Sequence, residues 1–462
     1  MGIATINPAT GELVKSFDPL TDEQLEDKLA RAARAFRDYR LTGVDERAGW
    51  LRAAADVLDK DGDHIAEVMT LEMGKTLVAA KAEAAKCAKA LRYFAEHGPA
   101  FLADAPADAD AVGAERAFVS YQPIGAVLAI MPWNFPLWQA MRFAAPALMA
   151  GNVGLLKHAS NVPQTALYLE ELFRKAGFPD DVFQTLLIGS SEVEKVLRDP
   201  RVAAATLTGS GPAGQSVAAI AGDVLKKTVL ELGGSDPYVV MPSADLDKAA
   251  EVAVTARCQN NGQSCIAAKR FIVHEDVADE FERLFAEKLA ALPVGDPMDE
   301  KTKVGPLATE SGRADVEELV EDAVAKGARV VTGGTRPDRP GWFYPPTLIA
   351  DITPEMRMYA EEVFGPVAGL FRVPDLDAAI ELANDTEFGL GSNIWTDVAA
   401  EQERFVRDVQ AGMVFVNGMT TSYPELPFGG VLTSGYGREL TELGMREFMN
   451  IKSIWVGANS ST

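Results

Sequence analysis

One cysteine lies in a polar segment rich in amides and small residues, NNGQSCIAAKR, at residues 260–270. The segment contains neither a second cysteine nor a histidine. A thiol there has four roles to consider: nucleophile, metal ligand, redox partner or inert core residue. Backbone amides of such a loop can support a thiolate and also stabilise an oxyanion.

The remaining cysteines and histidines argue against the other roles. Two helical turns would separate Cys258 from Cys265 by about 10 Å, beyond the roughly 7 Å limit for the Cα atoms of a disulfide. Cys87 lies in a predicted helix, where structural filler is the better interpretation. The four histidines show no metal-ligand spacing, so we expect no metal site. A Cys–His hydrolase needs a histidine close to the thiol, and no local histidine motif indicates one.

A glycine-rich turn gives the first cofactor signal. TLTGSGPAG matches G-x-G-x-x-G at Gly209, Gly211 and Gly214, between a predicted strand and a predicted helix. The free N–H groups at a helix N-terminus favour a phosphate; the alternative is a tight turn that binds nothing. The usual dinucleotide template would make Glu231 a ribose ligand. We set this assignment aside because Glu231 begins ELGG, a segment with another candidate use.

A lysine at the end of the predicted strand NVGLLK gives the second signal. Lys157 and Ser160 are followed by no acidic residue until Glu170. An acidic group would bind the ribose hydroxyls of NAD and repel a 2′-phosphate, so this pattern favours NADP, with NAD as the alternative. The other interpretation of Lys157 is a solvated lysine at a strand end.

Charge and composition limit the class of protein. The net charge is −23, from 44 basic and 67 acidic side chains, so we expect neither nucleic acid nor an anionic membrane as a partner. The N-terminal residues resemble no signal peptide, and no apolar stretch is long enough to span a membrane. An odd number of cysteines in a long chain suits a reducing cytoplasm.

The apolar pattern predicts two α/β domains that position these residues. The first hundred residues are predicted to be helical, and from about residue 125 short apolar strands alternate with helices. This alternation is typical of a parallel, doubly wound sheet. A second alternating set follows residues 232–234, and IKSIWV near the C-terminus predicts a last strand.

Six segments resemble motifs of the aldehyde dehydrogenase superfamily and occur along the chain in the order that the superfamily shows. They are ELGGSDPYVV (231–240), NNGQSCIAAKR (260–270), MPWNFPLWQAMR (131–142), LLKHASNVP (155–163), EEVFGPV (361–367) and ELPFGGVLTSGYGRE (425–439). Within the superfamily the chain is most similar to bacterial NADP-dependent succinate-semialdehyde dehydrogenases. In the last segment Leu432 and Thr433 stand where relatives usually carry a lysine and a polar residue, which puts the substrate specificity in question.

The resemblance implies a fold and an assembly. The fold would comprise two doubly wound α/β domains and a β-strand oligomerisation element. Residues 1–112 and 124–232 would form the cofactor-binding domain, 233–430 the catalytic domain, and 113–123 with 431–462 the oligomerisation element. A homodimer or homotetramer is expected.

The resemblance also implies a mechanism for oxidising an aldehyde. Cys265 would attack the aldehyde to give a thiohemiacetal, and Asn134 with the Cys265 N–H would hold the oxyanion. Glu231 would activate the water that hydrolyses the later thioester. Arg142 would bind the carboxylate of succinate semialdehyde, unless it forms a structural ion pair, and Ser422 would add a polar contact.

The cofactor contacts implied by the resemblance are Trp133, Asn134, Lys157, Ser160, Gly209, Ser210, Gly214, Leu232, Glu362 and Phe364. Gln259 stands where some relatives have a second arginine, which weakens the predicted carboxylate site. Three alternatives remain: oxidation of uncharged or aromatic aldehydes, acyl transfer to coenzyme A, and a non-catalytic structural homologue. The presence of both Cys265 and Glu231 argues against the last two.

Overall fold

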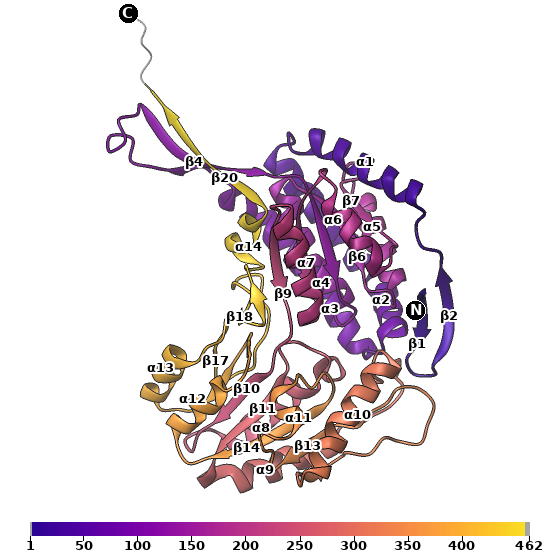
Figure 1. Cartoon of the computed structure of the whole chain (residues 1–462), viewed down its shortest axis with the longest axis vertical. Coiled ribbons are helices and arrows are strands. Elements are labelled where there is room, and N and C mark those ends of the chain that lie inside the picture. The colour runs from indigo at the N-terminus through magenta and orange to yellow at the C-terminus, as the bar shows by residue number, and fades with distance from the viewer. Residues whose placement is uncertain (1, 458–462) are drawn as a thin grey trace, which may run out of the picture.

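The computed structural model describes residues 2–457, which form two lobes and a projecting arm (Figure 1). The first lobe is built on a six-stranded sheet in the order β19-β9-β8-β5-β6-β7. Its strands are β5 (Ala126–Met131), β6 (Val153–His158), β7 (Phe183–Thr185), β8 (Val202–Thr208), β9 (Lys227–Glu231) and β19 (Gly435–Tyr436). The five strands from β5 to β9 run parallel, as their near-continuous apolar sequences predict.

Helices connect these strands and cover the sheet. They are α4 (Pro136–Ala150), α5 (Pro163–Lys175), α6 (Val193–Arg198) and α7 (Gly211–Asp223), with α1 (Asp22–Tyr39), α2 (Val44–Met73) and α3 (Leu77–Phe101) before them. The helix α4 is buried along its whole length because α2 and α3 pack over it. Asn134, which lies just before α4, is therefore positioned by a helix that is buried along its whole length.

The prediction of a wholly helical first hundred residues is wrong at the N-terminus. An antiparallel hairpin, β1 (Ile3–Asn7) and β2 (Glu12–Phe17), precedes α1. Its turn needs Gly11 at φ 78°, a left-handed conformation that glycine adopts without strain. Each strand is too short for its alternation of apolar and polar residues to stand out from the helical pattern that follows.

The second lobe contains a seven-stranded sheet in the order β12-β13-β14-β11-β10-β16-β17. Its strands are β10 (Asp236–Val240), β11 (Ala268–His274), β12 (Arg329–Thr332), β13 (Thr347–Ala350), β14 (Val367–Val373), β16 (Asn393–Trp395) and β17 (Phe415–Val416). Its main helices are α8 (Leu246–Cys258), α9 (Glu275–Ala290), α10 (Glu310–Ala325), α12 (Leu376–Asn384) and α13 (Ala399–Asp408). Sequence analysis did not identify β13, a four-residue strand.

Both sheets are mixed, which corrects the expectation of purely parallel sheets. The edge strand β19 runs antiparallel to β9, and the edge strand β12 runs antiparallel to β13. Two-residue β19 comes from a segment some 200 residues after β9, so no local pattern announces the pairing. The helix α14 (Thr441–Glu447) follows and packs on α4, so the chain returns to the first lobe before it ends.

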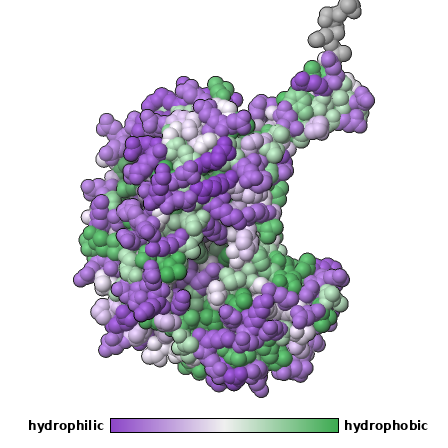
Figure 2. All heavy atoms as spheres, turned by 180° about the vertical axis from the view of Figure 1, so that it is seen from behind, coloured by the Kyte–Doolittle hydropathy of each residue, from purple (hydrophilic) through white to green (hydrophobic). Residues whose placement is uncertain are grey.

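The arm consists of β4 (Arg116–Pro123) and β20 (Met449–Val456), paired antiparallel along their whole length, with β3 (Ala105–Pro106) on the other side of β4. It projects from the first lobe in Figure 1, and Figure 2 shows hydrophobic residues on it beside hydrophilic ones. Ile451 and Trp455 are 61% and 59% exposed on it. The predicted C-terminal strand is thus confirmed, whereas the end of the range 431–462 lies outside the described residues.

Candidate active site

Cys265 lies where two cavities meet. One cavity, of about 290 Å³, is lined by Pro132, Trp133, Asn134, Thr208, Gly209, Ser210, Leu232, Gly233, Cys265, Glu362 and Phe364. The other, of about 60 Å³, is lined by Lys86, Phe135, Trp138, Gln139, Arg142, Gln259, Ser264, Cys265, Ile266, Thr421, Ser422 and Phe428. Cys265 is the residue common to both, so ligands in the two cavities would face each other across it.

The loop that carries Cys265 has an unusual backbone that its sequence permits. Asn260 and Asn261 adopt left-handed conformations with φ of 55° and 58°, which asparagine tolerates better than most residues. A Cβ on Gly262 would lie 2.4 Å from the carbonyl carbon of Gly365, so only glycine fits there. Arg257 points into the protein and donates to the carbonyl of Gly262 at 2.5 Å.

Two further contacts fix the loop from the side of the second lobe. The Nζ of Lys269 donates to the carbonyl oxygens of Ser264 and Cys265 at 2.9 and 2.8 Å. The same ammonium lies 3.0 Å from a carboxylate oxygen of Glu362. The Cys265 carbonyl is therefore held away from the cavities while its side chain faces them.

The Asn134 side chain is tied to the same loop. Its Nδ2 donates to the carbonyl of Gln263 at 3.2 Å, and the Asn260 amide donates to the Asn134 carbonyl at 2.7 Å. A side-chain amide has two N–H bonds, so one of them remains to meet an oxyanion beside Cys265. Asn134 precedes α4, and its position depends on the N-terminus of that helix.

Burial raises the pKa of the Cys265 thiol to about 12. The charges of Arg142 and Lys269 oppose this shift, whereas those of Glu362 and Glu231 add to it. The sulfur is therefore a neutral thiol at neutral pH. Reaction with a carbonyl requires a group that accepts its proton.

Glu231 lies at the end of β9 in a buried cluster with Arg142 and Glu439. The Arg142 Nε lies 2.6 Å from a Glu439 oxygen, and all three side chains are at most 5% exposed. Burial, and next the charge of Glu439, raises the pKa of Glu231 well above its usual value. Within residues 2–457 neither oxygen of Glu231 has a hydrogen-bond partner. A raised pKa makes the ionised carboxylate a stronger base than one in water, which suits a general base.

The match to known proteins agrees with this geometry. The family model "Aldehyde dehydrogenase family" matches residues 1–454. The chain belongs to the aldehyde dehydrogenase family. It is 65% identical over 462 residues to "Succinate-semialdehyde dehydrogenase [NADP(+)]" of Mycobacterium avium (strain 104), covering 100% of this chain and 98% of that protein. It is also 65% identical to "Succinate-semialdehyde dehydrogenase [NADP(+)] 1" of Mycobacterium tuberculosis (strain ATCC 25618 / H37Rv), over 99% and 100% of the two chains.

Two solved structures superpose on 99% of this chain. Gox0499 gives a TM-score of 0.97 at 41% identity, with 99% of this chain and 100% of that chain covered. Succinic semialdehyde dehydrogenase from Streptococcus pyogenes, in complex with NADP+, gives 0.96 at 39% identity with the same coverage. The aldehyde dehydrogenase fold expected from the sequence motifs is thus confirmed.

Most of the cofactor contacts predicted for an aldehyde dehydrogenase lie together in the larger cavity. These are Trp133, Asn134, Gly209, Ser210, Leu232, Glu362 and Phe364. Gly214 lies behind the wall: a Cβ there would be 2.6 Å from Leu232, so the glycine allows α7 to approach. Ser210 caps α7 without a side-chain hydrogen bond, which leaves the N–H groups of the first turn available to a phosphate. The buried hydroxyl of Thr208 has no partner within residues 2–457. These features fit a nicotinamide dinucleotide.

Lys157 and Ser160 do not lie in that cavity. Ser160 lines a separate hollow of about 510 Å³, together with Glu192 and Lys195. Burial lowers the pKa of Lys157 at the end of β6. Lys157 lies near the carboxyl end of β6, the strand next to β5, and Ser160 follows two residues after that strand ends.

Arg142 forms an ion pair within the protein, which was the alternative to binding the substrate carboxylate. Its guanidinium is paired with Glu439 and lies 4.2 Å from the centre of the Phe428 ring. Arg142 also lines the smaller cavity, as Ser422 does. Leu432 lines neither cavity of Cys265, so its departure from the family pattern does not change their walls.

Sequence analysis missed Lys86 and Glu439. Lys86 comes from α3 and lines the smaller cavity. Lys86 follows Glu83 by three residues on the alanine-rich helix α3. Two charged residues at this spacing share a helix face, and their position among small residues was the one signal that could have indicated a functional lysine. Glu439 gave no such signal, because its partners Arg142 and Glu231 lie far away in the sequence.

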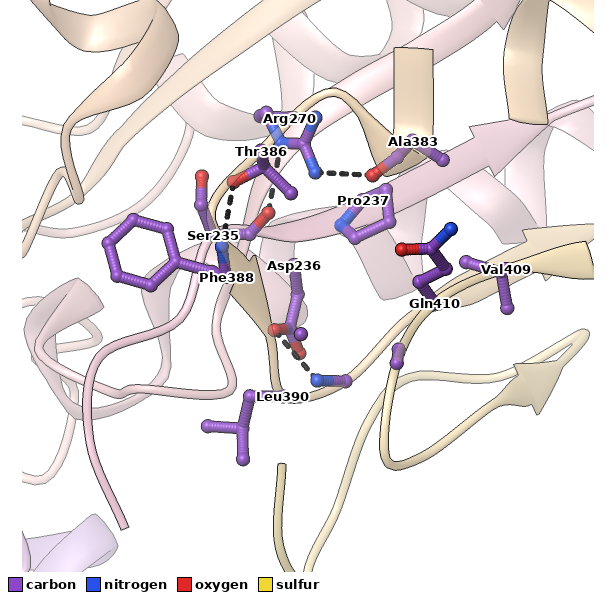
Figure 3. Close-up of a pocket in the computed structure, with 13 residues that line it drawn as sticks. Ser235, Asp236, Pro237, Arg270, Ala383, Thr386, Phe388, Leu390, Val409 and Gln410 are labelled. Atoms are coloured by element: carbon purple, nitrogen blue, oxygen red, sulfur yellow. Dashed lines mark hydrogen bonds between the residues drawn. The ribbon is translucent and has the colours of Figure 1, made fainter. Parts of the chain in front are cut away.

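A fourth cavity, shown in Figure 3, is not lined by Cys265. It has a volume of about 10 Å³, room for about one water molecule, and is lined by residues such as Asp236 and Arg270. Arg270 bridges the carbonyl oxygens of Ser235 and Ala383 at 2.9 and 2.8 Å. This arrangement anchors the first strand of the second lobe. Elsewhere in residues 2–457 no group of three His, Cys, Asp or Glu side chains is placed to hold a metal ion, and no helix is long and apolar enough to cross a membrane.

Proposed function

We propose that this chain oxidises succinate semialdehyde to succinate with NADP as the hydride acceptor. The observation that carries the proposal is the position of Cys265 on both cavities, one suited to a nicotinamide and one to a small aldehyde. Two mycobacterial proteins named for this activity are 65% identical to this chain. In each case the match covers at least 98% of both chains.

Cys265 attacks the aldehyde carbon, and a water molecule accepts the thiol proton and passes it to solvent as the carbon–sulfur bond forms. The second N–H bond of the Asn134 amide and the backbone N–H of Cys265 donate to the oxyanion of the thiohemiacetal. One such donor stabilises a developing oxyanion by about 3–4 kcal/mol. When bound, the nicotinamide accepts the hydride that this carbon loses, which leaves a thioester on Cys265.

Glu231 then removes a proton from the water that attacks the thioester. The carbon–sulfur bond breaks, the acid leaves and the Cys265 thiol is restored. The raised pKa of Glu231 makes it a stronger base than a solvated carboxylate once it is ionised. The positive charge of Arg142 limits that rise, and its pairing with Glu439 ties the three groups into one cluster.

The preference for NADP rests on Lys157 and Ser160 at the carboxyl end of β6, where no acidic residue follows before Glu170. The cytoplasm is the proposed location, because all three cysteines are free thiols in the described chain. We also propose a homodimer or homotetramer. The arm of β4 and β20 supports this proposal, since it holds Ile451 and Trp455 exposed and away from the core.

The test is the rate of NADPH or NADH formation, followed by absorbance at 340 nm, with succinate semialdehyde and with butanal. The proposal predicts the highest kcat/KM for succinate semialdehyde with NADP. An equal or higher kcat/KM for butanal would contradict the substrate assignment but leave the chemistry of Cys265 intact. No reduced cofactor with any aldehyde would support a non-catalytic homologue.

A further inference from the structure

The smaller cavity contains a lysine that no motif assigns. The side chain of Lys86, from α3, is half-buried, and its Nζ donates to the Ser422 hydroxyl at 2.8 Å. The ammonium also lies 4.3 Å from the centre of the Trp138 ring, whose Nε1 donates to the same hydroxyl at 2.9 Å. Lys86 and Ser422 are therefore oriented together on the wall that Cys265 completes.

Two positively charged side chains line this cavity, and one of them is already paired with a carboxylate. Lys86 and Arg142 are the charged residues of its wall, and no acidic side chain lines it. Arg142 is paired with Glu439 at 2.6 Å. For Lys86, by contrast, no carboxylate of the described residues lies within ion-pair distance. Gln259, on the same wall, is neutral. The cavity thus presents one uncompensated positive charge, and it belongs to Lys86.

We propose that Lys86, with the Ser422 hydroxyl, binds the distal carboxylate of the substrate and determines the specificity for short ω-carboxylated aldehydes. The inference rests on the proposed function and deepens it. The ammonium supplies a charge-assisted hydrogen bond, and the hydroxyl, which now accepts from Lys86 and Trp138, can turn its own O–H to the carboxylate. Arg142 pairs with Glu439 through its Nε, and its Nη2 on the same cavity wall has no hydrogen-bond partner within residues 2–457.

The titration of Lys86 agrees with this role. Burial, and next the charge of Arg142, lowers the pKa of Lys86 to about 8. Lys89 acts in the same direction, whereas Glu83 and Cys87 oppose it. A bound carboxylate favours the charged lysine, so binding is strong below pH 8 and weakens as the pH rises through it. The KM for succinate semialdehyde should therefore rise relative to that for butanal between pH 7 and 9.

The experiment compares Lys86→Met with Lys89→Met, each measured with succinate semialdehyde and butanal. Lys89 lies on the same helix but faces outwards, where it pairs with Glu425. Lys86→Met should raise the KM for succinate semialdehyde by about 10- to 100-fold, the value of one hydrogen bond to a charged group, with little change for butanal. Lys86→Arg should recover part of the loss, and Lys89→Met should change neither substrate.

An unchanged KM for succinate semialdehyde in Lys86→Met would overturn the proposal, as would an equal loss for both aldehydes. If Lys86→Met does not fold, the ratio of the two KM values in the unmodified protein decides: a ratio constant from pH 7 to 9 contradicts a role for Lys86. Failure of the proposed function gives a different result, because the unmodified protein would then not prefer succinate semialdehyde at any pH.

Discussion

The N-terminus of α4 depends on a buried ion pair, and removing it should affect both stability and catalysis. Glu83 accepts from the backbone N–H groups of Leu137 and Trp138 at 2.9 and 2.8 Å, and its other oxygen is bonded to the Lys75 ammonium. Lys75 and Glu83 are 0% and 4% exposed. Lys75 also lies 4.4 Å from the centre of the Phe135 ring, directly after Asn134.

Glu83→Ala leaves the Lys75 charge buried without a partner and frees two N–H groups of α4. Loss of one partner of a buried pair costs about 3–5 kcal/mol in the free energy of unfolding. Because Asn134 immediately precedes α4, its amide should also move, and a displacement of about 1 Å can reduce kcat by as much as 100-fold. Both aldehydes should be affected alike, since the oxyanion is common to them.

Urea unfolding followed by tryptophan fluorescence measures the first effect, and steady-state kinetics the second. The double variant Lys75→Met/Glu83→Ala removes both charges, so its loss should fall short of the sum of the losses in Lys75→Met and in Glu83→Ala by about 2–3 kcal/mol. Lys81 lies on α3, as Glu83 does, and forms an exposed pair with Asp63 of α2; Lys81→Met should leave the urea midpoint unchanged. Additive single losses, or an unchanged midpoint in Glu83→Ala, would refute the reasoning.

Three further predictions concern the cluster near Cys265 and the second lobe. Glu231→Gln should lower steady-state turnover by about 100- to 10,000-fold and leave a burst of NADPH in rapid mixing; loss of the burst would show that Glu231 acts before the thioester. Arg142→Ala should reduce turnover of butanal as well as succinate semialdehyde, because it removes the counter-ion of Glu439; loss with succinate semialdehyde alone would make Arg142 the carboxylate ligand. Burial raises the pKa of Asp236 to about 6, above its value in the unfolded chain, so the stability that its protonated form provides is lost as the pH rises from about 4 through 6. Asp236→Asn should remove this part of the pH dependence, measured as the urea midpoint from pH 4.5 to 7.5, and an unchanged profile would contradict the raised pKa.

The parts of the fold that local sequence specifies were predicted. The buried strands β5, β6 and β8 are continuous apolar runs, and the helices between them follow a 3.6-residue period. The exceptions are short or remote elements. The hairpin of β1 and β2 lacks the length to show a period. Two-residue β19 pairs with β9, although the strands of the second lobe lie between them in the sequence.

The sequence is enough to predict the reactive groups, because they are embedded in segments whose residue types are restricted by local geometry. Left-handed Asn260 and Asn261 shape the loop of Cys265, and the glycine turn before α7 leaves its N–H groups free. The tertiary structure decided how the charges are shared. Lys86 and Ser422 are 336 residues apart in sequence yet hydrogen-bonded, while Arg142 is compensated by Glu439. The energy of a charge depends on its burial and on its neighbours in space, and residue spacing along the chain reports neither.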